Sequence, residues 1–133
     1  MLPEKDITMR KKISVLQVAT LNRPIRHDLG YGPIETVIYN IDKGLHKLGH
    51  RSIVACSGDS DVVGEQYTTI GKSFSEYWSS DTNVQRESMR IHLSQSLERA
   101  KRGDIDIIHN DDVLSGLTGG INCRFDPQIF YVE

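Results

Sequence analysis

The sequence predicts an α/β fold: a doubly wound, Rossmann-like parallel sheet with helices on both faces. Short runs rich in β-branched and apolar residues alternate with longer segments of helical periodicity, which is typical of this class. A length of 133 residues, 38% hydrophobic residues and a net charge of −2 fit one globular domain. We therefore expect one sheet, with successive parallel strands joined by right-handed crossovers.

The first strand is expected at residues 13–19, an apolar and β-branched run. Residues 20–32 break every period, because Asn22, Pro24, Gly30 and Gly32 interrupt them, so this segment is predicted to be a long loop.

The clearest helix begins at Pro33 and ends before Gly49. Proline loses nothing at a first helical position, and glycine readily adopts the left-handed conformation that ends a helix. Its apolar residues recur at steps of three and four, which predicts one buried face. That face would contain Ile34, Val37, Ile38, Ile41, Leu45 and Leu48.

The rest of the chain continues the alternation. A strand is expected at residues 51–56, and a second helix from about Val84 to Lys101, with His92 at its surface or boundary. The inner stripe of that helix would be Met89, Leu93, Leu97 and Ala100. Further strands are expected at 67–70, 105–109 and 128–132, a short helix at 113–121, and core-covering aromatic residues at Phe74, Tyr77 and Trp78.

Composition excludes several classes of function. The near-neutral charge gives no general reason to bind nucleic acid or an anionic membrane. No apolar run approaches the roughly 18 residues that span a bilayer, and residues 1–12 do not form a signal peptide. Cys56 and Cys123 have neither zinc nor redox spacing, and no metal site is expected. We expect a soluble, cytoplasmic chain.

Two segments should lie beyond the carboxyl ends of the strands, where open α/β sheets bind ligands. Gly30 and Gly32 precede the first helix, where a glycine can let a ligand phosphate approach free N–H groups or can simply turn the chain. Both interpretations remain open. His109, Asp111 and Asp112 form the densest polar cluster, suited to a polyhydroxylated substrate or to an ordinary Asn/Asp turn.

Familiar catalytic and nucleotide motifs are absent from the sequence. Glu35 occupies the place of the third glycine in a dinucleotide fingerprint, and no phosphate-cradling P-loop or G-x-S-x-G elbow is present. His27 and Asp28, in the long loop, are expected to face water.

Taken in order, these segments resemble the N-terminal domain of the group 1, retaining glycosyltransferases of the two-domain GT-B fold. That family typically has a strand, a glycine loop reading G-G-x-E or G-P-I-E, a long helix ending in G-H, and a later D-[IV]-[IV]-H segment. The resemblance covers residues 12–116, and the matching pieces are residues 13–18, 30–35, 45–50 and 103–109.

The resemblance implies a hexosyltransferase of carbohydrate biosynthesis that moves a sugar, with retention, from a nucleotide-sugar donor to a hydroxyl acceptor. The nucleotide-sugar is a substrate, and no cofactor is implied. Gly32, and less closely Gly30, match the loop that approaches the donor diphosphate. His109, Asp111 and Asp112 match the acceptor or sugar side, although the family often has histidine where Asp111 stands. No catalytic residue is assigned.

The family's nucleotide-binding domain lies C-terminal to the matched region. Residues 1–133 are therefore expected to be a single, incomplete, acceptor-side domain that is inactive alone. Uncovered apolar surface would favour self-association. The alternative is a stand-alone, non-catalytic α/β module that binds a ligand or a partner.

Overall fold

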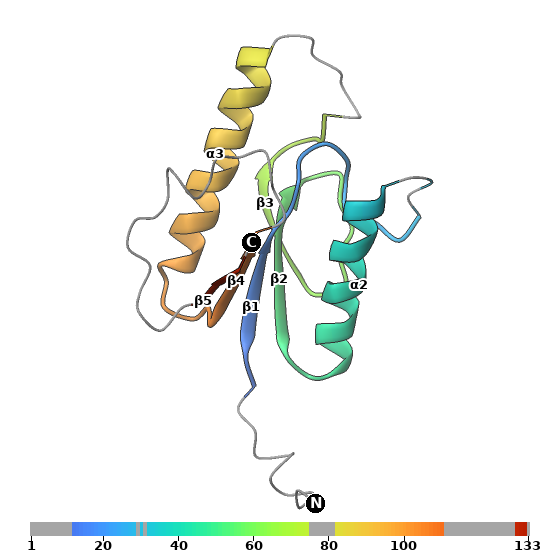
Figure 1. Cartoon of the computed structure of the whole chain (residues 1–133), viewed down its shortest axis with the longest axis vertical. Coiled ribbons are helices and arrows are strands. Elements are labelled where there is room, and N and C mark those ends of the chain that lie inside the picture. The colour runs from blue at the N-terminus through green and yellow to red at the C-terminus, as the bar shows by residue number, and fades with distance from the viewer. Residues whose placement is uncertain (1–11, 29, 31, 75–81, 111–129, 133) are drawn as a thin grey trace, which may run out of the picture.

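A computed structural model describes residues 12–28, 30, 32–74, 82–110 and 130–132. Within this part of the chain, five parallel strands form one sheet in the order β3-β2-β1-β4-β5. The helices α2 and α3 lie on opposite sides of it (Figure 1). The predicted fold class is confirmed. The elements are β1 Ser14–Val18, α2 Pro33–Lys47, β2 Arg51–Ser57, β3 Glu65–Ile70, α3 Thr82–Ala100, β4 Ile107–Asn110 and β5 Phe130–Val132.

Each face of the sheet has its own apolar cluster, because alternate residues of a strand point to opposite faces. On the α3 side, Ile53 and Ala55 of β2 pack with Leu16 of β1 and Ile108 of β4, among others. On the α2 side, Val54 and Cys56 of β2 pack with Ala19, Ile25 and Ile38. Strand β2 is therefore buried on both faces, which explains its continuous apolar sequence.

All five predicted strands are present, with boundaries shifted by a few residues. Strand β4 begins two residues later than expected, because Asp106 makes other contacts with the start of β1. The Asp106 N–H donates to the Ser14 carbonyl at 2.8 Å, and its carboxylate accepts the Ser14 N–H at 2.8 Å. Phe74 is buried, as predicted. The expected helix at 113–121, together with Tyr77 and Trp78, lies outside the described residues.

The predicted inner face of α2 is wrong in part. Ile38 is buried, but Val37 is 53% exposed and Leu48 is 76% exposed. The helix instead buries the carboxylates of Glu35 and Asp42. Because hydrogen bonds hold these two carboxylates in the interior, the most apolar face of the helix does not face the sheet. Ile34 is also exposed, and Ile41 and Leu45 are half-buried.

Helix α3 also departs from its predicted stripe. Ala100 is buried and Met89, Leu93 and Leu97 are half-buried, but the most deeply enclosed side chains include polar ones. The prediction that His92 lies at the surface or boundary is wrong, since its side chain is fully buried. These polar residues are His92, Ser96 and Arg99.

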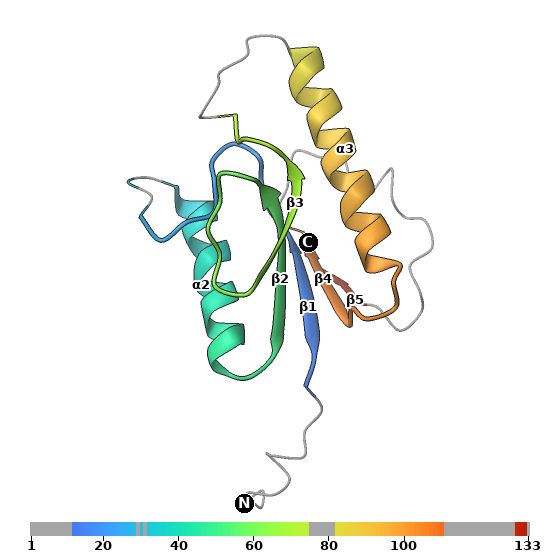
Figure 2. The ribbon, with the colours of Figure 1, turned by 180° about the vertical axis from the view of Figure 1, so that it is seen from behind.

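The connection from β2 to β3, residues 58–64, is short for a parallel crossover and has no helix of its own. It runs beside α2 (Figure 2). The carboxylate of Asp42 on α2 accepts the N–H of Val63 at 2.7 Å and of Gly64 at 3.2 Å, and the hydroxyl of Ser52 at 2.6 Å. Asp42 thus satisfies backbone groups that a crossover helix would otherwise satisfy internally.

The amino edge of the sheet is held by ion pairs. Arg51 on β2 pairs with Glu65 on β3 at 2.5 Å and with Asp104 at 2.8 Å. Asp104 also accepts from the buried guanidinium of Arg99 at 2.7 Å. Hydrogen bonds from Arg99 and Arg51 keep the pKa of Asp104 well below its usual value.

Candidate functional site

The strand order reverses between β1 and β4, and this defines the topological switch point of the sheet. The chain leaves β1 for α2 on one face and enters β4 from α3 on the other. Open α/β sheets bind ligands beyond the carboxyl ends of the strands at this position. The glycine loop follows β1, and His109 and Asn110 end the adjacent β4. The glycine loop and the end of β4 therefore follow adjacent strands at the same, carboxyl edge of the sheet.

The loop after β1 is anchored over the carboxyl ends of β2 and β3. The N–H of Ile25, whose side chain is fully buried, donates to the Ser60 hydroxyl at 2.9 Å, and its carbonyl accepts from Asp61 at 2.8 Å. Leu21 accepts the N–H of Phe74 at 2.8 Å. These bonds fix the first part of the loop, residues 21–25, against the segments that follow β2 and β3.

A buried hydrogen bond clasps the two ends of the glycine loop. The hydroxyl of Thr20, just after β1, donates to the Glu35 carboxylate in the first turn of α2 at 2.6 Å. Both residues are at most 5% exposed. A Cβ added at Gly32 would lie 2.8 Å from Glu35 Oε1 and 3.3 Å from Arg23 Cδ. Glycine at position 32 therefore leaves room for the clasp.

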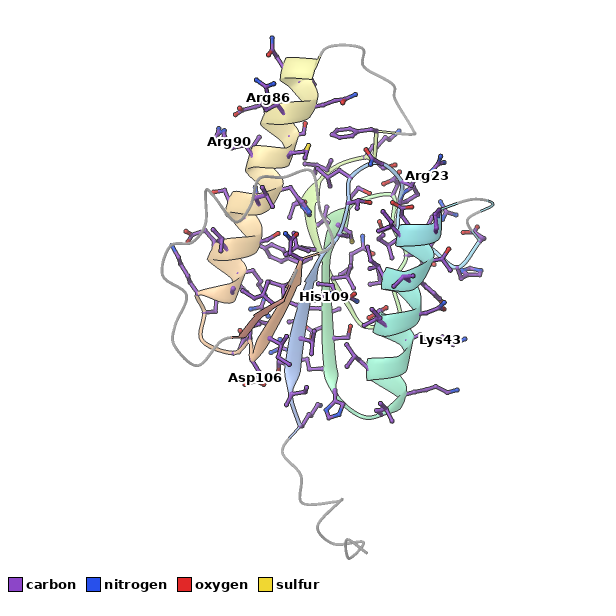
Figure 3. The ribbon with its side chains drawn as sticks, in the orientation of Figure 1. Arg23, Lys43, Arg86, Arg90, Asp106 and His109 are labelled. Atoms are coloured by element: carbon purple, nitrogen blue, oxygen red, sulfur yellow. The ribbon has the colours of Figure 1, made fainter. Side chains whose placement is uncertain are left out.

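The two glycines differ. Gly30 is exposed, and a Cβ there would meet none of the described atoms within 4 Å. Arg23 lies beside the start of α2, where the helix dipole also favours negative charge (Figure 3). The approach of a ligand phosphate to Gly32, expected from the sequence, is not needed to explain that glycine and stays a prediction.

His109 lies on the α2 side of the sheet and is half-buried. Its neighbour Ile108 points into the cluster on the α3 side, which fixes the face of His109. It is the register partner of Gln17 on β1. Figure 3 shows His109 within the sheet, and Asp106 just before the start of the same strand. Asp111 and Asp112, the other predicted residues of this cluster, lie outside the described residues.

His92, on α3, contacts the same carboxyl edge of the sheet. Its Nε2 is 2.7 Å from the carbonyl of Ala19 at the end of β1, and its Nδ1 is 2.5 Å from the Thr69 hydroxyl on β3. Burial lowers the pKa of His92 to about 4, against a smaller opposing effect of the bond to Ala19. The ring is therefore neutral at physiological pH, and the Ala19 carbonyl assigns the proton to Nε2.

Other sequence candidates have no evident chemical role among the described residues. His27 and Asp28 are exposed, as predicted, and Asp28 pairs with Arg26 at 2.9 Å. Burial raises the pKa of the Cys56 thiol to about 12, which leaves it unreactive. The ring of His50 accepts the Ile13 N–H at 3.3 Å.

Among the described residues, no cluster of three or more metal-ligating side chains occurs. No helix in that part of the chain is long and apolar enough to cross a bilayer.

Sequence reasoning missed four residues that shape this edge: Gln17, Thr20, Glu35 and His92. A polar residue in a buried apolar strand was a signal for Gln17. Glu35 lies within the G-P-I-E segment that carries the resemblance, but nothing in that segment indicates Thr20 as its partner. Nothing in the local sequence distinguishes His92 from an exposed helical histidine.

Comparison with known proteins indicates one family. Residues 32–132, well over half of the chain, match the family model described as Glycosyltransferase Family 4. No curated protein and no solved structure shows significant similarity to the chain. The Rossmann-like sheet is consistent with the N-terminal type of domain in a GT-B fold. The chain belongs to Glycosyltransferase Family 4.

Proposed function

We propose that the chain is the acceptor-side part of a retaining, cytoplasmic glycosyltransferase of the group 1 type. It would move a hexosyl group from a nucleotide-sugar donor to a hydroxyl acceptor. One observation supports this above the others: in a chain of this family, the glycine loop and the polar end of β4 follow the two adjacent strands at the switch point of the sheet.

The two segments would have different roles. The donor diphosphate would approach the start of α2 near Gly32, where the positive end of the helix favours an anion. Pro33 removes one N–H from that turn, so the remaining amides and the helix dipole would supply the interaction. His109, with Asp111 and Asp112, would hydrogen-bond the hydroxyl groups of the acceptor or of the transferred sugar. The nucleotide-sugar is a substrate in this scheme, and no metal or cofactor is invoked.

We further propose that the nucleotide is held by a second domain outside these 133 residues. The chain alone would then transfer no sugar, because the donor needs both lobes for orientation. The alternative is a non-catalytic α/β module that binds a ligand or a partner.

The experiment compares this chain with the product of any reading frame that continues past Glu133. Both are incubated with UDP-glucose, UDP-N-acetylglucosamine or GDP-mannose and a panel of sugar acceptors, and the anomeric configuration of any product is read by NMR. We expect retention from the longer protein and no turnover from this chain. Turnover by the chain alone would refute the need for a second domain, and an inverted product would refute retention. A frame that stops at Glu133, or an extended protein without transfer, would favour the binding module.

Three variants of the longer protein test the glycine loop. Gly32→Ala adds a methyl group where Glu35 already lies, whereas Thr20→Val breaks the clasp without adding an atom at position 32. Gly30→Ala is the control, since its side has room. We expect Gly32→Ala to lower kcat/KM for the donor more than Thr20→Val does, and Gly30→Ala to have the smallest effect. Equal losses for Gly32→Ala and Thr20→Val would assign the effect to the clasp instead of donor approach.

A further inference from the structure

We propose that His92 is a positioning residue for the glycine loop. By holding the carbonyl of Ala19, it fixes the direction in which the chain leaves β1 and so directs the Thr20 hydroxyl at Glu35. The consequence for donor use rests on the proposed function, since the loop is there the approach to the diphosphate. The contacts that carry the inference are formed in the structure and do not depend on that function.

His92 reaches from α3 to the end of β1. Its Nε2–H donates to the Ala19 carbonyl at 2.7 Å, and its Nδ1 accepts the Thr69 hydroxyl of β3 at 2.5 Å. These bonds hold both nitrogens of the ring, and the side chain is 0% exposed. The ring therefore has a fixed orientation, with its one donor directed at Ala19.

Ala19 lies where the chain leaves the sheet. The register of β1 with both neighbouring strands ends at Val18. The Ala19 N–H still donates to the Ala55 carbonyl of β2 at 3.0 Å, whereas the Ala19 carbonyl accepts from His92. Because a buried carbonyl without a donor costs free energy, the bond from His92 opposes rotation of the peptide that joins Ala19 to Thr20.

That peptide leads directly into the clasp of the glycine loop. Thr20 donates to the Glu35 carboxylate in the first turn of α2 at 2.6 Å, and α2 lies on the opposite side of the sheet from α3 (Figure 1). In the same turn, the Gly32 carbonyl accepts the Thr36 N–H at 2.8 Å. Hydrogen bonds on the two sides of one peptide therefore connect His92 with the start of α2.

Two substitutions separate the two ring nitrogens of His92. Glutamine extends an amide N–H about as far as Nε2, so His92→Gln keeps a donor for Ala19 but loses the acceptor for Thr69. Asparagine places an amide oxygen near the position of Nδ1, so His92→Asn keeps that acceptor but does not reach Ala19. Positioning through Ala19 predicts that only His92→Asn loosens the loop, whereas a merely structural role predicts similar damage from both.

The test is hydrogen exchange of the 133-residue chain, followed by NMR at two amides of α2. The Thr36 N–H reports on the first turn, and the Leu48 N–H, bonded to the Gly44 carbonyl at 3.0 Å, reports on the far end of the same helix. We expect His92→Asn to lower the protection of Thr36 about fivefold relative to Leu48, as the loss of one typical hydrogen bond predicts. His92→Gln should leave this ratio unchanged.

Further variants assign the effect to the clasp. Leu93→Ala, on the same helix, loosens the apolar cluster without removing a bond to Ala19, and should keep the wild-type ratio. In a Thr20→Val background, His92→Asn should cause no further loss, because the clasp through which it acts is already broken. If His92→Asn does not fold, Thr69→Val takes its place: the ring loses its bond to β3, and we expect a smaller loss of Thr36 protection.

Several results would overturn the proposal: equal losses in His92→Asn and His92→Gln, an equal loss in Leu93→Ala, or the same further loss in the Thr20→Val background. Wild-type protection in His92→Asn, or in Thr69→Val where that variant replaces it, would also overturn it. Hydrogen exchange requires no sugar transfer, so a failed transfer assay and a failed positioning role are distinguishable.

Discussion

Acidification should destabilise the protein through His92. The ring is fully buried between α3, the end of β1 and strand β3, and burial lowers its pKa to about 4. In the unfolded chain a histidine has a pKa of about 6.5. Between these two values the unfolded state binds one more proton than the folded state, so stability falls as the pH falls. The contribution is complete above about pH 6.5 and is lost progressively toward pH 4.

The size of the effect follows from the shift. A difference of about 2.5 pKa units corresponds to about 3 kcal/mol over the whole window, at about 1.4 kcal/mol per unit. Between pH 7 and pH 5 the loss is about 2 kcal/mol. The carboxylates with lowered pKa values, including Asp104, Glu65 and Asp59, release their stabilisation mainly at lower pH. The window from pH 7 to 5 therefore isolates histidine titration.

The assay is urea unfolding at pH 7 and pH 5 for the wild type and His92→Gln. We expect the wild type to lose about 2 kcal/mol more than the variant over this interval, because glutamine does not titrate. His46→Gln, at the exposed end of α2, is the matched control and should keep the wild-type pH dependence. If wild type and His92→Gln lose the same stability, the neutral buried imidazole is not the acid-sensitive group.

Three further predictions concern packing, charge and association. Gly64→Ala should lower the free energy of unfolding by about 2 kcal/mol or more, because its Cβ would overlap the carbonyl oxygen of Ser52 on β2. Gly44→Ala, in open space within α2, should raise the free energy of unfolding by about 0.5–1 kcal/mol, and urea unfolding of both variants measures this. Asp104→Asn should lower the free energy of unfolding by about 1–3 kcal/mol, because it weakens the bidentate pair with the buried guanidinium of Arg99. Equal melting temperatures for the wild type and this variant would contradict the prediction. Val37→Glu should lower self-association through the exposed apolar face of α2, measured by light scattering; a wild type that stays monomeric at high concentration would exclude that role.

The sequence was sufficient for the order of elements because that order depends on local patterns. Proline and glycine mark the two ends of α2, and apolar β-branched runs mark the central strands. Together with the right-handed crossover rule, these patterns predicted a sheet with helices on both faces and two candidate segments at one edge.

The orientation of the helices was not accessible in the same way. Apolar periodicity predicted that Val37 and Leu48 lie on the buried face of α2. Asp42 and Glu35 are buried instead, because they accept hydrogen bonds from the β2–β3 connection and from Thr20. Such partners are distant in sequence, so helical periodicity cannot reveal them. His92 was misplaced for the same reason, since its partners lie 73 and 23 residues away.

The Asp42 carboxylate has a consequence for the order of assembly. The segment that leads into β3 reaches its place only where α2 already presents an acceptor for its amides. We therefore expect β3 to join the sheet after α2 has docked on β2, and to be the first of the strands β1–β3 to detach. Native-state hydrogen exchange would show this as earlier deuteration of β3 than of β2, and simultaneous exchange would argue for a single cooperative unit.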